Sequence, residues 1–60
     1  MLGMTLYSSE TKVADIVALL NAQTIENDPP EEAWTYRVAT RGKFFAVAVY
    51  DETDFFLGYL

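Results

Sequence analysis

Residues 33–50, AWTYRVATRGKFFAVAVY, contain two segments rich in β-branched and aromatic residues, separated by Arg41-Gly42. Residues of these types favour β-strands, and glycine suits a tight turn between antiparallel strands. The sequence therefore predicts a hairpin with strands at residues 33–40 and 43–50 and a two-residue loop at Arg41-Gly42. In this register Val38 lies opposite Phe45.

A third strand is predicted at residues 55–60, after the segment Asp51-Glu52-Thr53-Asp54. Asp51 suits the first position of a type I turn, and Asp54 tolerates the left-handed conformation that such a loop requires. These preferences predict a three-residue loop with Asp51 opposite Phe55. A two-residue loop is the alternative, and it would exchange Phe55, Leu57 and Tyr59 with Phe56, Gly58 and Leu60 between the sheet faces.

One amphipathic helix is predicted before the strands. Its apolar positions recur at helical spacing, and Ser8 and Ser9 suit its N-terminal cap. We expect it to run from residue 9 or 10 to Ala22 or Gln23, and the breaker Asn27-Asp28-Pro29-Pro30 to separate it from the strands. The short apolar segment Met4 to Tyr7 is a candidate edge strand. The apolar stripe of the helix comprises Val13, Ile16, Val17 and Leu20, widened by Leu19.

The predicted fold is a single α+β domain covering residues 1–60, with one helix packed on an antiparallel sheet. The sheet has three strands, or four if the segment at residues 4–7 joins it. A domain of 60 residues buries only about 60% of the surface that its unfolded chain exposes. The chain has no cysteine and no histidine, so neither disulfides nor Cys/His zinc sites can support it. We therefore expect association with a second copy or with another protein.

Strand alternation predicts two apolar sheet faces, and one helix can cover only one of them. The face under the helix includes Trp34, which we expect in the core. The other face has a central lane of small residues, which would let a second backbone approach closely and form a contact surface. The simpler interpretation is that alanine and glycine tolerate exposure. The predicted interaction face comprises Phe44, Ala46, Ala48, Tyr50, Phe56, Gly58 and Leu60.

The charge pattern predicts a polarised molecule with a net charge of −5. Arg37, Arg41 and Lys43 are expected toward the opposite end of the sheet from most of the acids. Solvated turns attract acidic residues in any case, and the calcium-binding spacing of an EF-hand loop is absent, so no metal site is predicted. The predicted acidic end comprises Asp28, Glu31, Glu32, Asp51, Glu52 and Asp54.

Several classes of function are disfavoured by the sequence. Nucleophilic catalysis lacks cysteine and an imidazole base, and Ser8 and Ser9 are better explained as helix caps, so neither an enzyme nor a cofactor is expected. The aromatic residues could stack nucleic-acid bases, but an acidic chain lacks the basic groove that direct binding needs. No apolar stretch is long enough to cross a membrane. The segment Met1 to Met4 lacks the basic start of a secretory signal, which predicts a cytoplasmic protein.

Two hypotheses from different classes remain. The first is a non-catalytic interaction module that docks through its second sheet face, most simply as a homodimer, because one apolar patch is self-complementary about a two-fold axis. A heterologous protein partner is the variant of this hypothesis. The second is a small acidic inhibitor of the phage or plasmid type, which would act as a decoy in a basic site of a nucleic-acid-binding enzyme.

Overall fold

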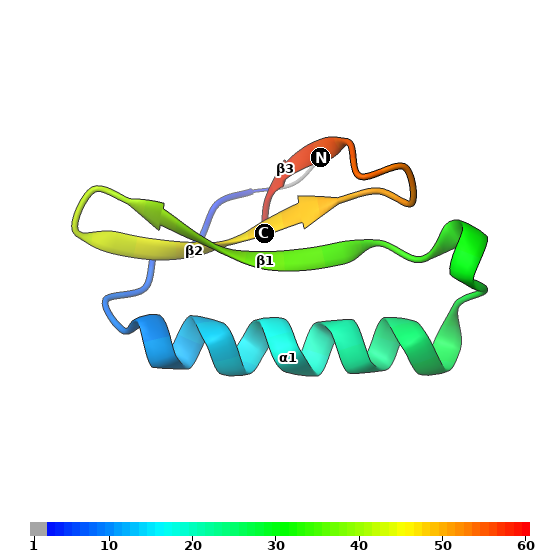
Figure 1. Cartoon of the computed structure of the whole chain (residues 1–60). Helices are drawn as coiled ribbons and strands as arrows, with labels where there is room; N and C mark the ends of the chain where they lie inside the picture. The colour runs from blue at the N-terminus through cyan, green and yellow to red at the C-terminus, as the bar shows by residue number, and fades with distance from the viewer. Residues whose placement is uncertain (1–2) are drawn as a thin grey trace.

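The structure is a computed structural model that describes residues 3–60. Met1 and Leu2, part of the segment on which the prediction about a secretory signal depends, lie outside the described residues. One helix is followed by a three-stranded antiparallel sheet, which confirms the predicted α+β class (Figure 1). The elements are α1 (Glu10–Asn27), the short 3-10 helix η1 (Pro30–Glu32), β1 (Thr35–Arg41), β2 (Phe44–Tyr50) and β3 (Phe56–Tyr59), and the sheet order is β1-β2-β3.

Helix α1 begins at its predicted cap and ends later than predicted. The Ser9 hydroxyl accepts a hydrogen bond from the Lys12 backbone N–H at 3.2 Å. The helix continues past Gln23 to Asn27, because no residue in that stretch stops a helix before Pro29. Asp28, which precedes this proline, is extended, and its N–H closes the last turn on the Thr24 carbonyl at 2.9 Å.

The core lies between α1 and the strands β1 and β2 (Figure 1). Val13 of the helix and Val47 and Val49 of β2 are fully buried there. Two predictions about this core are wrong. Leu19 is 59% exposed, so it does not widen the buried stripe, and Trp34 is 41% exposed because it precedes β1 at the end of the sheet.

The first hairpin turns one residue later than predicted. Arg41 pairs with Phe44, so the loop is Gly42-Lys43, and Val38 lies opposite Val47 instead of Phe45. Gly42 has a φ of 63°, which places glycine at the first central position of the turn, where a positive φ is required. Each pairing moves by two residues, and for this reason the predicted faces of β1 and β2 are unchanged.

The second hairpin has the predicted loop, followed by an irregularity. Asp54 has a φ of 68°, and the Asp51 N–H donates to the Phe55 carbonyl at 2.9 Å, as the three-residue loop requires. Tyr50 pairs with Phe56, but Val49 pairs with Gly58, so Leu57 is an unpaired extra residue. Gly58 has a φ of 144°, a conformation that other residues rarely adopt. Beyond this bulge, the faces of β3 are exchanged relative to the prediction, and Tyr59 lies opposite Ala48.

The segment before α1 joins the edge of β2 that β3 leaves free. Tyr7 and Phe45 exchange two backbone hydrogen bonds of 2.8 Å, and the Thr5 N–H donates to the Leu60 carbonyl at 3.1 Å. In Figure 1 this segment rises from the level of the helix toward β3. The contact to β2 is a single bridge, so of the two alternatives the sheet has three strands and not four.

Strand β1 forms the other edge of the sheet, and α1 is attached to it by Asn21. Its side-chain amide bonds to both the N–H and the C=O of Tyr36, which therefore point away from β2. Because backbone groups alternate along a strand, those of Val38 and Thr40 also point outward. Among residues 3–60, no helix is long and apolar enough to cross a membrane.

Candidate functional site

The sheet face turned away from α1 is the first candidate site, and we call it the outer face. Two of the seven predicted contact residues do not belong to it. The bulge places Gly58 opposite Val49, and the Leu60 N–H donates to the Val47 carbonyl. Because Val47 and Val49 face α1, Gly58 and Leu60 lie on the helix side of the sheet. Register and side-chain contacts assign to the outer face Arg37, Ala39, Arg41, Phe44, Ala46, Ala48, Tyr50, Phe56 and Tyr59.

The lane of small residues is already covered within the chain. Ala46 is 0% exposed and Ala48 is 3% exposed. The Arg41 guanidinium lies 5.1 Å from the ring of Tyr59. Arg41 is in β1 and Tyr59 is in β3, so the arginine side chain crosses the central strand β2. The small side chains leave room for this crossing. They are therefore not available for the close approach of a second backbone, which corrects that part of the sequence-based interpretation.

The accessible part of the outer face consists of aromatic rings and guanidinium groups. The ring of Phe56 lies 5.5 Å from that of Tyr50 and 5.1 Å from that of Tyr59, in tilted arrangements that aromatic pairs prefer. The Arg37 guanidinium lies 4.3 Å from the centre of the Tyr50 ring. Phe44 and Phe56 remain 45% and 42% exposed. This surface combines apolar area with guanidinium groups that lie against aromatic rings.

The acidic end is the second candidate site. Figure 1 shows η1 and the loop between β2 and β3 at the same end of the sheet, as predicted, with the β1–β2 loop at the other end. Five of the six predicted acids lie in these two segments. The sixth, Asp28, is the C-terminal cap of α1. Among the described residues, no three His, Cys, Asp or Glu side chains are arranged to hold a metal ion.

Two of the six acids have structural partners. The Asp51 carboxylate accepts hydrogen bonds from the Thr53 hydroxyl at 2.7 Å, the Thr53 N–H at 2.8 Å and the Phe55 N–H at 2.9 Å. The hydroxyl of Thr53 is the largest cause that lowers the Asp51 pKa, followed by the N–H of Phe55. Asp54 pairs with Arg37 at 2.6 Å. Arg37 thus reaches the acidic end, contrary to the prediction that it lies toward the opposite end.

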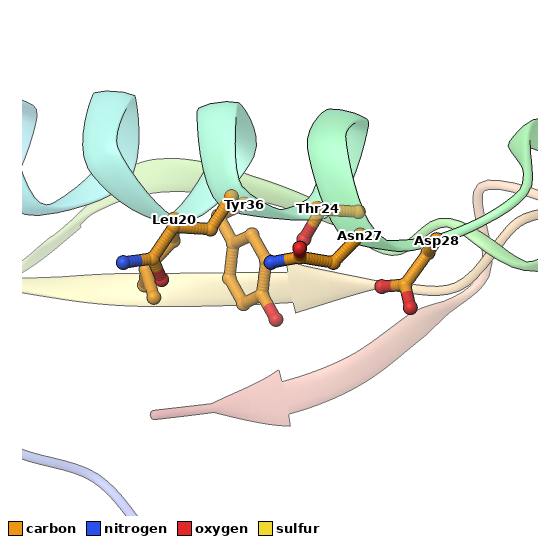
Figure 2. Close-up of a pocket in the computed structure, with 6 residues that line it drawn as sticks. Leu20, Thr24, Asn27, Asp28 and Tyr36 are labelled. Atoms are coloured by element: carbon orange, nitrogen blue, oxygen red, sulfur yellow. The ribbon is translucent and has the colours of Figure 1, made fainter.

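A hollow between the C-terminal half of α1 and the start of β1 is the third candidate site, and the sequence does not predict it. Its volume is about 210 Å³. The only signal for it in the sequence is the polar residue Asn21 beside the apolar positions of the helix. Figure 2 shows the ring of Tyr36 between Leu20 and Asn27, below the helix. The hollow is lined by Leu20, Gln23, Thr24, Asn27, Asp28 and Tyr36.

The groups on these three surfaces are suited to binding. The outer face offers aromatic rings and guanidinium groups, the acidic end offers carboxylates, and the hollow combines hydroxyl, amide and carboxylate groups with an apolar wall. Comparisons with protein-family models, with curated proteins and with solved structures give no match for this chain.

Proposed function

We propose that this protein is a non-catalytic interaction module that forms a homodimer through its outer face. The observation that carries the proposal is the combination of exposed Phe44 and Phe56 with the ring–guanidinium contacts of Arg37 and Arg41. Aromatic residues and arginine are the types enriched at the centres of protein interfaces. A face of this kind binds through rings and guanidinium groups, so the buried alanine lane is not needed as contact area.

A second copy is the occupant favoured by the distribution of charge. Arg41 and Lys43 lie at the β1–β2 loop, whereas Glu31, Glu32 and Glu52 lie at the opposite end. Two outer faces stacked about a two-fold axis, with their strands antiparallel, would bring the basic end of each copy toward the acidic end of the other. Burying the outer face in a dimer would also add to the stability of each copy, because a 60-residue domain has little core of its own.

The test is the molar mass in solution. Phe44→Ser and Phe56→Ser each remove exposed ring surface from the outer face, and Leu19→Ser removes a similarly exposed apolar side chain from α1. Light scattering coupled to size exclusion at micromolar concentration should give a dimer for the unmodified chain and for Leu19→Ser. The two phenylalanine variants should shift toward the monomer. A monomer mass for the unmodified chain, with a melting temperature independent of concentration, would contradict the proposal.

A second candidate function is an acidic decoy for a basic site on a nucleic-acid-binding enzyme. It is favoured by the placement of η1 and the β2–β3 loop at one end of the sheet, which gathers Glu31, Glu32 and Glu52 there. Affinity for such an enzyme should fall steeply with salt, whereas docking through apolar rings should be far less sensitive. The triple change of these residues to glutamine should abolish enzyme binding and leave the melting temperature unchanged. Intact binding by the triple variant would refute the decoy.

A further inference from the structure

We propose that the hollow between α1 and β1 binds the guanidinium group of an arginine side chain presented by a peptide or protein. The hollow lies on the helix side of the sheet, at the C-terminal end of α1. The proposal therefore concerns a different surface from the outer face and does not depend on dimerisation.

The size of the hollow limits what can occupy it. Its volume of about 210 Å³ is below the roughly 300–1,000 Å³ of sites that enclose drug-sized ligands. A single side chain, or a small molecule of comparable size, is the class of ligand that fits.

The walls suit a planar group with an apolar stem. Leu20 supplies apolar surface, and the ring of Tyr36 lies beside it (Figure 2). Guanidinium groups stack on aromatic faces, and the methylene stem of arginine packs against apolar side chains. The backbone of Tyr36 is held against α1 by the two Asn21 hydrogen bonds of 2.9 and 3.0 Å. The backbone that carries this ring is therefore held in place before a ligand arrives.

Thr24 places a hydroxyl group on the wall of the hollow. It is the most buried polar residue of the described chain, at 8% exposure, and its hydroxyl forms no hydrogen bond with the other described residues. Every fully sealed side-chain nitrogen or oxygen among residues 3–60 has a partner. The Thr24 hydroxyl is therefore not sealed, and the opening that it lines is the hollow. Water can reach this hydroxyl in the free protein, and a donor on a ligand could take the place of that water.

The remaining polar groups favour a cation that only donates hydrogen bonds. Gln23 and Asn27 contribute side-chain amides, which can accept through their oxygens, and Asp28 contributes a carboxylate, whereas no lysine or arginine lines the hollow. Glu31 and Glu32 follow closely in η1 and add negative charge at this end. A guanidinium presents five N–H donors in a plane and can address several of these acceptors at once. An ammonium has the same charge but lacks the planar face that stacks on Tyr36.

The experiment uses the full chain and three probes, N-acetyl-arginine amide and its lysine and citrulline analogues. Citrulline keeps the shape of arginine and removes its charge. Titration is followed by the backbone amide signals in nuclear magnetic resonance spectra. The arginine probe should shift signals of residues 20–28 and 36 in a saturable manner, with a dissociation constant in the millimolar range, about what a ligand of this size reaches. The lysine and citrulline probes should bind about tenfold more weakly or worse.

Matched variants separate the hollow from general acidity. Asp28→Asn and Glu52→Gln each remove one carboxylate at the acidic end, but only Asp28 lines the hollow. Asp28→Asn should weaken arginine binding about tenfold, and Glu52→Gln should change it less than about twofold. Thr24→Val, which keeps the side-chain volume and thus the fold, should also weaken binding. Three results would overturn the proposal: no saturable shifts, equal weakening by Asp28→Asn and Glu52→Gln, or equal affinity for the lysine probe.

Discussion

The side-chain amide of Asn21 satisfies both outward-facing backbone groups of Tyr36. Its Nδ2 donates to the Tyr36 carbonyl oxygen at 3.0 Å, and its Oδ1 accepts from the Tyr36 N–H at 2.9 Å. A neighbouring strand would make the same pair of hydrogen bonds at this position. The helix therefore ends the sheet at Tyr36 and is fixed to its edge by the same contact.

Replacing Asn21 by alanine should lower the free energy of unfolding by about 1–2 kcal/mol, because two hydrogen bonds are lost. Alanine is the better helix former, so a loss of stability cannot be attributed to helix propensity. Asn21→Asp keeps the acceptor and loses the donor. Its free energy of unfolding should lie between those of the unmodified chain and Asn21→Ala. Urea unfolding followed by circular dichroism gives these values, with Gln23→Ala as the helix control. A stability equal to or above that of the unmodified chain would contradict this role of Asn21.

Gly42→Ala should destabilise the first hairpin by about 1–2 kcal/mol, the cost of a left-handed conformation for a residue with a side chain. The φ of 63° is the sole cause, because a Cβ at this position would have no neighbour within 4 Å. Gly42→Asn should cost less, since asparagine tolerates this region better. Urea midpoints of the three proteins test the order. Equal midpoints for Gly42→Ala and the unmodified chain would mean that the turn adjusts without cost.

The ion pair of Arg37 and Asp54 should contribute little to stability despite its distance of 2.6 Å. The two side chains are 51% and 65% exposed, and exposed pairs usually contribute less than about 1 kcal/mol. A double-mutant cycle with Arg37→Gln and Asp54→Asn measures the coupling, which should shrink further at high salt. A coupling well above this value that persists in salt would show that the contact with Tyr50 shields the pair.

Asp51 should make part of the stability depend on pH. Its folded-state pKa is lowered from 3.8, mainly by the Thr53 hydroxyl and the Phe55 N–H. The ionised form thus favours folding: its contribution is complete well above pH 3.8 and is lost as the pH falls through the lowered folded-state pKa. Asp51→Asn should be less stable than the unmodified chain at neutral pH, and the difference should narrow in acid. Urea midpoints across this pH range test the prediction, and a constant difference would contradict it.

The elements were predictable because each depends on local chemistry. Helical spacing and Ser9 locate α1, and alternating β-branched and aromatic residues locate the hairpins. Registers were harder to predict, because Gly42 fits either central position of a two-residue loop and only the paired strands select one. Asp54 was read correctly because only a left-handed residue closes the three-residue loop.

Contacts between elements could not be predicted from the sequence. Arg41 reaches across β2 to Tyr59 and Ala46 is fully buried, yet a sequence pattern shows only a small residue on a sheet face. The hollow needs Asn21 and Tyr36 to meet, and they are distant in the sequence. The homodimer and the cytoplasmic location stay predictions.

The unpaired Leu57 determines on which face of the sheet the later side chains of β3 lie. Side chains alternate between the two faces along a strand, and one extra residue reverses this alternation relative to the partner strand. Because of this reversal, the Tyr59 ring lies beside that of Phe56 on the outer face. For the same reason, the Arg41 guanidinium meets the Tyr59 ring after it crosses β2. Removing Leu57 would remove the bulge and keep Gly58 opposite Val49 and Tyr59 opposite Ala48, so the Tyr59 ring would stay on the outer face. If the bulge instead closed with Leu57 retained and paired with Val49, Gly58 would lie opposite Ala48, and the β3 margin of the outer face would change from aromatic to small.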